Sequence, residues 1–484
     1  MKNKTLNRCY KMAKPHLKTI FLVSILAIII DLMELSKPYL VKVVIDDFLS
    51  LGISEKAFIS INLIGVTYLA IVVFGNVLDY YTRMKTNIMG EEILYTLRNK
   101  IYKYTQEANI KFHDKTPAGK LYARITNDVD DISALFKDVI TTLFKDLMSI
   151  FAVICIMIYF SIKLSLLSFI VIPFVIITSI ALTKILNKIY ETSKVVRTNL
   201  NTFLAESIYG AKLIKIFNIQ EEKQNECEGY TQEFINKRLK ATIFEGIFPG
   251  IMTLFENLAI TIIITSCIYH FWGISMEVGA IYIFVSYIKS LFEHINRTID
   301  SIEIVQEAFV SINKIYDILD EKEFLEDFES GIEPEKIVGK IEFKHVWFAY
   351  NDENWILKDI SFTIEPGETI ALVGKTGSGK TTITNLVNRF YEIQKGEILL
   401  DGINIKDINI RYLRRHIGTV LQDPFIFARS IKDNIKLNKK ISNEEIENAI
   451  KMASADEFIN NLPNGIEEIS KERGESFSAG QKQL

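Results

Sequence analysis

The stretch Thr369–Thr381 (TIALVGKTGSGKT) decides the fold of the second half of this chain of 484 residues. Its last eight residues, which begin at Gly374, match the pattern GxxxxGK[ST] of a phosphate-binding P-loop. The five residues before this loop are mostly apolar and predict a buried strand, and the stretch TTITNLVNRF, which begins at Thr381, predicts a helix. Because a strand, a glycine-rich loop and a helix in this order form the P-loop unit, we predict an α/β nucleotide-binding domain.

The residue types in the loop suit an anionic ligand. Glycines let the backbone wrap a phosphate with its N–H groups pointing inward, and the helix that begins near Gly379 directs its positive end at the same anion. Lys380 can reach the β- and γ-phosphates, and the Thr381 hydroxyl can ligate Mg²⁺. We therefore expect a nucleoside triphosphate and Mg²⁺ to bind here. The predicted binding residues of this segment are Gly374, Lys375, Thr376, Gly377, Ser378, Gly379, Lys380, Thr381 and Thr382.

The first 310 residues have a different character. A transmembrane helix needs about 20 apolar residues, and six stretches of this half meet that length. They lie at about 19–45, 57–82, 139–160, 163–184, 247–270 and 276–299. One such stretch could be a buried helix of a soluble protein, but six of them predict an all-α membrane domain over residues 1–310.

The distribution of Lys and Arg predicts the orientation of these helices. The N-terminus is basic, and so are the two long connections at about 83–138 and 185–246, which places all three on the cytoplasmic side. Both connections show apolar residues at helical spacing, with breaks at Thr116–Gly119 and at Tyr209–Gly210. We expect the membrane helices to continue into the cytoplasm as two stalks that turn at these breaks.

Three acidic residues fall within the apolar stretches, namely Asp31, Glu34 and Glu256. Charges at such depth face a cavity or a partner. One interpretation is a substrate path that favours cationic or amphipathic molecules, and the alternative is structural pairing with nearby bases.

An acidic stretch with Gly331 and Pro334 follows, and it predicts a linker over residues 311–337 before a nucleotide domain over 338–484.

The formal net charge of −3 gives no sign of a nucleic-acid partner. The four cysteines lie far apart without a CxxC pair, which argues against a disulfide scaffold or a zinc site.

Three further motifs surround the P-loop, namely VWFAY at Val346–Tyr350, VLQDPFIF at Val420–Phe427 and ERGESFSAGQ at Glu472–Gln481. Together with the P-loop they resemble the A-loop, Q-loop and signature of an ABC transporter half-molecule of the exporter type. The resemblance covers nearly the whole chain, and it implies a six-helix membrane domain followed by an ATP-binding domain.

The resemblance also implies roles for single residues. Tyr350 would stack on adenine, and Gln422 would contact Mg²⁺ or the attacking water as a catalytic residue. Ser478, Gly480 and Gln481 would contact the ATP held on the P-loop of a partner chain.

The signature departs from the family pattern, since Phe477 replaces leucine and Ala479 replaces glycine. A weakened site of this kind is typical of heterodimers, so a heterodimer is slightly favoured over a homodimer.

The stalk tips resemble the intracellular loops of exporters. The first tip is Phe112–Leu121 with the following RITNDV, and the second is Glu206–Lys212 with Phe217. The resemblance implies that both tips dock on nucleotide domains and transmit their closure.

The Walker B strand, the catalytic glutamate and the switch histidine of the family do not occur before Leu484. We therefore expect a fragment of a dimeric, ATP-driven exporter of small amphipathic substrates, located in the cell membrane, and we expect the 484-residue form to hydrolyse ATP negligibly. Two alternatives stay open, namely an ATP-binding subunit with a regulatory or inactive role and an importer component.

Overall fold

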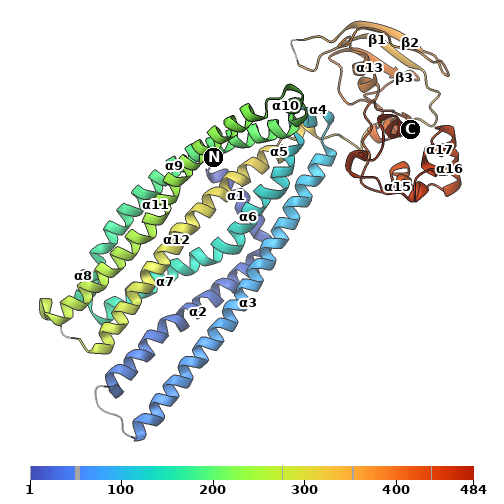
Figure 1. The fold of residues 1–484 in the computed structure, drawn as a ribbon. Helices are drawn as coiled ribbons and strands as arrows, with labels where there is room; N and C mark the ends of the chain where they lie inside the picture. The colour runs from blue at the N-terminus through green and yellow to red at the C-terminus, as the bar shows by residue number, and fades with distance from the viewer. Residues whose placement is uncertain (1, 50–54, 275, 352–353, 438) are drawn as a thin grey trace. The chain divides into compact units, whose positions relative to one another are not determined.

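The computed structural model describes residues 2–49, 55–274, 276–351, 354–437 and 439–484, and it divides into two compact units (Figure 1). The first unit comprises residues 1–106 and 116–323, and the second comprises residues 107–115 and 324–484. The segment 107–115 is therefore inserted in the sequence of the first unit but packs within the second.

The first unit is entirely helical in its described part. It contains the six predicted helices that are long and apolar enough to span a membrane, which confirms this count. The helices are α1 (Lys2–Ala13), α2 (Leu17–Val43), α3 (Glu55–Glu107), α5 (Ala118–Ala123), α6 (Val129–Ala134), α7 (Ile140–Phe160), α8 (Ile162–Phe169), α9 (Val171–Tyr209), α10 (Ala211–Phe217), α11 (Gln220–Ile268) and α12 (Val278–Leu319). Short π-helical and 3-10 turns join several of them.

Several helices extend well beyond their apolar stretches, as predicted for stalks. Helices α9 and α11 run side by side for most of their length, and α3 is a single helix of 53 residues (Figure 1). The predicted breaks are also confirmed. Pro117 precedes α5 with an extended backbone, and Gly210 separates α9 from α10.

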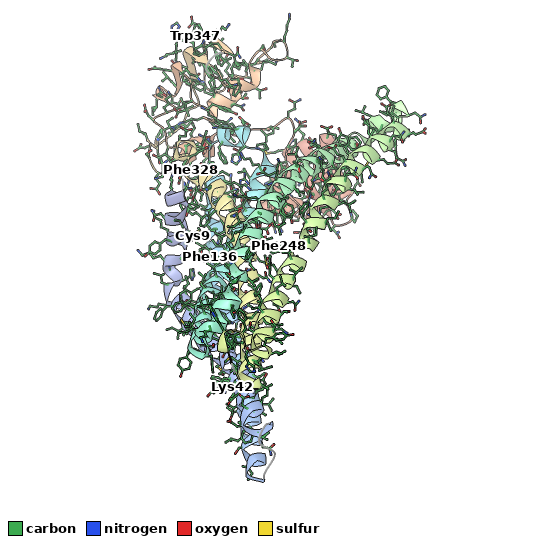
Figure 2. All side chains as sticks on the ribbon, turned by 90° about the vertical axis from the view of Figure 1, so that its left-hand side faces the viewer. Cys9, Lys42, Phe136, Phe248, Phe328 and Trp347 are labelled. Atoms are coloured by element: carbon green, nitrogen blue, oxygen red, sulfur yellow. The ribbon has the colours of Figure 1, made fainter. Side chains whose placement is uncertain are left out.

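Two apolar cores hold this unit together. One lies among the membrane-spanning parts of α7, α8, α9, α11 and α12, and the other lies where α3 packs against α6 and α12. In the second core, Met89, Ile93, Leu97 and Ile101 are buried at intervals of four residues, so that they form one stripe of α3. Phe136 is completely buried against this stripe (Figure 2).

The second unit contains a small antiparallel sheet with the strand order β2-β1-β3-β4. The strands are β1 (Ile341–Phe348), β2 (Leu357–Ile364), β3 (Lys395–Leu400) and β4 (Ile403–Asn404), and the first two confirm the predicted strands. The helices are α4 (Ile110–Lys115), α13 (Lys380–Val387), α14 (Ile410–His416), α15 (Ile431–Lys436), α16 (Asn443–Met452), α17 (Asp456–Asn460) and α18 (Ala479–Gln483). Phe343, Phe348 and Leu386 are central in the core between this sheet and α13.

The prediction of a buried strand at 369–373 is wrong for this structure. The segment is not part of the sheet, and Val373 is 93% exposed. A strand becomes regular only when a neighbour pairs with its backbone, and none of the four described strands pairs with this segment.

The segment between α12 and β1 is fixed along the second unit. Helix α12 extends to Leu319, so the first part of the range expected as a linker is helical. Further on, Asp401 accepts hydrogen bonds from the backbone N–H groups of Val338 (2.7 Å), Gly339 (3.0 Å) and Lys340 (2.8 Å). These three bonds hold the chain at the point where it enters β1.

Candidate nucleotide-binding site

The P-loop leads directly into α13. Gly377 and Gly379 adopt φ angles of +84° and +89°, a region that side chains other than glycine rarely occupy. A Cβ atom on Gly379 would also lie 2.7 Å from the Cδ2 atom of Leu357. The loop therefore needs glycine at position 379 for two independent reasons, one conformational and one steric.

Lys380 holds the loop in a closed curve. Its Nζ atom donates to the carbonyl oxygens of Gly374 (2.8 Å) and Lys375 (2.9 Å), and the N–H of Ser378 donates to the same Lys375 oxygen (3.1 Å). The loop is thus wound around an ammonium group, and the donors of Lys380 point into it. An anionic ligand would replace neutral carbonyl acceptors by a stronger, charge-assisted acceptor. The arrangement fits a phosphate group.

The structure brings Tyr350 to the P-loop helix. The Tyr350 hydroxyl lies 3.2 Å from the Oγ1 atom of Thr382, which is buried in the first turn of α13. The Tyr350 ring packs edge-on against Phe348 and Tyr391, with centroids 4.9 and 5.0 Å apart, yet the residue is 39% exposed. An accessible part of an aromatic ring beside a phosphate-binding loop is a platform for a flat base.

One further residue, Tyr391, extends this arrangement, and sequence reasoning missed it. Tyr391 contacts the rings of Phe348 and Tyr350, and its hydroxyl donates to the carboxylate of Asp114 in α4. Burial and this hydrogen bond raise the pKa of Tyr391, so its hydroxyl keeps the proton that it donates. Tyr391 follows α13 without any recognisable motif, so nothing in the sequence marks it.

Gln422 and Thr381 are both exposed, and no hydrogen bond joins Gln422 to the P-loop within the described residues. The chain just before Gln422 is nevertheless tied to the end of α13, because the Thr419 hydroxyl donates to the Oδ1 atom of Asn388 at 3.1 Å. The structure therefore anchors the Q-loop segment near its start and leaves the amide of Gln422 at the surface.

The signature residues form a separate site. Ser478 caps α18, because its hydroxyl accepts from the N–H of Gln481 (3.2 Å) while the Gln481 side chain accepts from the N–H of Ser478 (2.9 Å). A Cβ atom on Gly480 would meet nothing within 4 Å. Across the described ranges, no hydrogen bond links these residues to the P-loop of the same chain.

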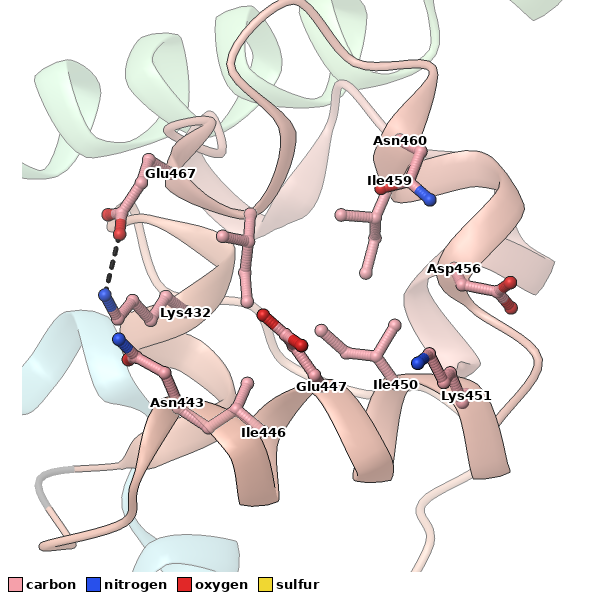
Figure 3. A pocket seen from close by; sticks show the side chains of 11 residues that line it. Lys432, Asn443, Ile446, Glu447, Ile450, Lys451, Asp456, Ile459, Asn460 and Glu467 are labelled. Atoms are coloured by element: carbon pink, nitrogen blue, oxygen red, sulfur yellow. Dashed lines mark hydrogen bonds and ion pairs between the residues drawn. The ribbon is translucent and has the colours of Figure 1, made fainter.

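Another pocket lies among α15, α16 and α17, with a volume of about 450 Å³ (Figure 3). The buried side chains of Ile446 and Ile459 line it, and the ion pair between Lys432 and Glu467 (2.8 Å) lies at one side. It contains none of the predicted nucleotide-binding residues. The residues that the structure describes include no group of three or more His, Cys, Asp or Glu side chains placed to hold a metal ion.

The first unit contains a charged cavity of about 520 Å³ among α2, α3, α7 and α12. Each acidic side chain that lines it is paired with a base. The pairs are Asp31–Lys145 (3.5 Å), Glu34–Lys37 (2.6 Å), Asp79–Arg83 (2.7 Å) and Glu293–Arg297 (2.8 Å). The structure thus supports the interpretation that Asp31 and Glu34 are paired with nearby bases. It does not support the alternative that their negative charges select cationic substrates. Glu256 is half-buried and does not line this cavity.

Comparison with known proteins places this geometry in a family. The model of the ABC transporter transmembrane region matches residues 20–295, and the model named ABC transporter matches residues 357–484. The chain belongs to the ABC transporter family. A membrane region and an ATP-binding region on one chain make it a half-transporter of the exporter type and a multi-pass membrane protein. Members of this family bind ATP and work as dimers in a membrane.

The half-transporter is similar over most of its length to bacterial exporters. It is 30% identical to a Bacillus subtilis protein that carries the name multidrug export ATP-binding/permease protein, over 99% of this chain and 83% of the relative. It is 29% identical to an ATP-dependent lipid A-core flippase of Syntrophus aciditrophicus, over 98% of this chain and 78% of the relative. It is also 31% identical to an ABC transporter ATP-binding protein of Streptococcus pneumoniae, over 88% of this chain and 74% of the relative.

Proposed function

We propose that this half-transporter is one subunit of a dimeric exporter in the cell membrane, with its N-terminus and its nucleotide-binding unit in the cytoplasm. ATP binding closes two nucleotide-binding units, and this closure switches the membrane helices between inward and outward access. The observation that carries the proposal is the P-loop wound around Lys380, with Tyr350 hydrogen-bonded to its helix, in a chain with six membrane-spanning helices.

The P-loop geometry supports a role for each predicted residue. Lys380 turns its donors from the loop carbonyls to the β- and γ-phosphates, and the N–H groups of residues 374–382 hold the phosphate oxygens. Tyr350 stacks on adenine with its exposed part. Mg²⁺, when bound with ATP, offsets the phosphate charge, and the exposed Thr381 and Gln422 side chains are free to approach it. Gln422 also orients the attacking water.

We further propose that Ser478, Gly480 and Gln481 contact the ATP bound to the P-loop of a second subunit. Their position apart from their own P-loop and the open space around Gly480 support this arrangement. Ala479 adds a methyl group at this contact, which weakens one of two composite sites and slightly favours a heterodimer over a homodimer.

The lining of the charged cavity suits an amphipathic substrate. Its tyrosine and aliphatic side chains offer apolar surface, and its paired charges leave neither sign in large excess. A small molecule with both apolar and polar parts finds partners there.

The second stalk tip and the domain limits complete the proposal. Leu213, Ile216 and Phe217 of α10 are exposed apolar side chains outside the membrane-spanning stretches, and we propose that they dock on a nucleotide-binding unit. For the functional limits we propose a membrane domain over residues 1–310, a linker over 311–337 that includes the last residues of α12, and a nucleotide domain over 338–484 that packs with segment 107–115.

The test compares two lysines of the same loop in vesicles that contain a purified dimer whose ATP-binding domains include the Walker B strand and the catalytic glutamate of the family. Lys380→Ala is expected to weaken binding of a fluorescent ATP analogue by at least about tenfold, which corresponds to about 1.4 kcal/mol, and to abolish efflux of an amphipathic dye. Lys375→Ala removes an equal charge, and it is expected to change affinity less than about threefold, because only its backbone carbonyl contacts Lys380.

Unchanged dye efflux in Lys380→Ala vesicles would refute ATP-driven export by this chain. Binding of the analogue without efflux or turnover would favour the regulatory subunit. ATP-dependent dye uptake in the opposite direction would favour an importer component.

A further inference from the structure

We infer that Tyr391 is a positioning residue that transmits occupancy of the adenine site to segment 107–115, through Tyr350 on one side and Asp114 on the other. The inference rests on the proposed function, because it takes Tyr350 as the residue that stacks on adenine. The inference assigns a role to the hydroxyl group of Tyr391, a residue that lies outside all of the sequence motifs.

The first part of the argument is an unbroken series of contacts inside the second unit. The Thr382 and Tyr350 hydroxyls are 3.2 Å apart, and the Tyr350 and Tyr391 rings meet edge to face at 89° with centroids 5.0 Å apart. The Tyr391 hydroxyl then donates to the Asp114 carboxylate. The P-loop helix is thus connected to α4 by three side-chain contacts.

The second part concerns the attachment of segment 107–115. The N–H of Asn109 donates to the carbonyl of Phe324 (2.7 Å), and the N–H of Glu326 donates to the carbonyl of Glu107 (3.0 Å). Phe112 is 1% exposed and packs on the Phe324 ring with centroids 5.8 Å apart. These contacts fix the first part of the segment, and the hydrogen bond from the Tyr391 hydroxyl to Asp114 ties its last part to the chain that follows α13.

The third part is the covalent continuity of the chain. Segment 107–115 directly continues the membrane-spanning helix α3, which ends at Glu107, and it leads through Thr116 to α5. A shift of α4 therefore acts on two helices of the membrane unit through the backbone itself.

The fourth part is energetic. A ligand shifts a conformational equilibrium only through a difference in its contacts with the two states. A base that stacks on Tyr350 fixes this ring, and the edge-to-face contact passes the constraint to Tyr391. Inorganic triphosphate fills the P-loop without touching Tyr350. The contacts from Tyr350 through Tyr391 to Asp114 therefore respond to ATP and not to triphosphate. This difference distinguishes an effect of the bound base from an effect of the phosphates alone.

The test is amide hydrogen exchange, read by mass spectrometry on the full chain in detergent with saturating ATP or inorganic triphosphate. ATP is expected to slow exchange in segment 107–115 by about fivefold, a change that one net hydrogen bond supports, and triphosphate is expected to leave it unchanged. Tyr391→Phe keeps the ring but loses the hydroxyl, and it is expected to abolish the ATP effect at 107–115 while residues 374–387 remain protected by ATP.

Tyr412→Phe is the matched control. It removes a hydroxyl that donates to the carbonyl of Pro334 in the same unit but outside the series of contacts, so the ATP effect should persist. Asp114→Ala removes the acceptor instead of the donor, and it should reproduce Tyr391→Phe if that variant does not fold.

Equal protection of 107–115 by triphosphate and by ATP would overturn the inference, and so would full protection in both Tyr391→Phe and Asp114→Ala. If ATP failed to protect residues 374–387 in the unaltered protein, the proposed nucleotide site itself would be wrong. The two failures are therefore distinguishable in one experiment.

Discussion

The Arg414 guanidinium binds the Glu326 carboxylate through two parallel hydrogen bonds of 2.7 Å each. The same guanidinium donates to the backbone carbonyls of Asn388 (3.2 Å) and Arg389 (3.1 Å), just beyond the end of α13. Because Glu326 also bonds the backbone of Glu107, one arginine connects the end of the P-loop helix to the base of α4.

Arg414→Ala should destabilise the protein by about 2–4 kcal/mol, since it leaves a buried carboxylate without its cation. Arg414→Lys should recover only part of this loss, because a lysine cannot bind both carboxylate oxygens in parallel. Chemical denaturation measures both values. Arg411→Ala is the control, because Arg411 makes only a cation–π contact with Phe328 among its described side-chain interactions. Equal stability of Arg414→Ala and Arg411→Ala would refute the structural role of the pair.

Acid should weaken the attachment of the linker to β1. Burial by itself would raise the pKa of Asp401, but the hydrogen bonds from the N–H groups of Lys340, Gly339 and Val338 outweigh it and lower this pKa below its ordinary value. A depressed carboxyl pKa contributes stability above the unfolded pKa, and the contribution disappears as pH falls through the folded pKa. Unfolding measured between about pH 6 and 3 should therefore show a smaller loss of stability in Asp401→Asn than in the unaltered protein. An identical pH dependence of the two proteins would contradict this expectation.

Gly379→Ala should impair nucleotide binding strongly. The substitution meets both a φ angle of +89° and a close approach to Leu357, so it should cost more than about 1 kcal/mol and weaken ATP binding at least about tenfold. Gly418→Ala is the steric control, because its Cβ atom would meet nothing within 4 Å and its φ angle is not positive. Titration with a fluorescent ATP analogue and thermal unfolding distinguish the two variants. Similar affinities would show that the loop tolerates a methyl group at position 379.

Lys145→Met should destabilise the membrane unit. Asp31 is 6% exposed, and the loss of Lys145 leaves its carboxylate with a serine as its described partner, at a cost of about 2–4 kcal/mol. Lys37→Met affects Glu34, whose side chain is 53% exposed, so it should change stability by less than about 1 kcal/mol. Thermal unfolding in detergent gives the comparison. If the double variant Asp31→Asn/Lys145→Met were less stable than Lys145→Met alone, the pairing interpretation would fail.

Much of this architecture follows from the sequence alone. Apolar length predicts the six membrane-spanning helices, and proline or glycine predicts the breaks beside Pro117 and Gly210, because these signals are local. The P-loop is equally local, since its glycines and Lys380 are needed within a few residues of one another.

The errors and omissions concern relations between distant residues. The apolar stretch before Gly374 does not form a strand here, because strand formation depends on a neighbour and not on composition alone. The charges at Asp31 and Lys145 are more than a hundred positions apart, so only the structure reveals that they neutralise one another. Tyr391 was missed for the same reason, because its partner Asp114 lies far earlier in the chain.

The assignment of segment 107–115 to the second unit has a consequence for biosynthesis. The ribosome synthesises Phe112 long before Phe324. The Phe112 ring therefore has no Phe324 ring to pack against while the helices between them are synthesised and inserted. The nucleotide-binding unit is therefore a discontinuous domain that cannot mature until most of the membrane unit has been translated. A gene fragment that starts at residue 324 would yield a domain without its α4 piece, with the Phe324 ring left uncovered by Phe112.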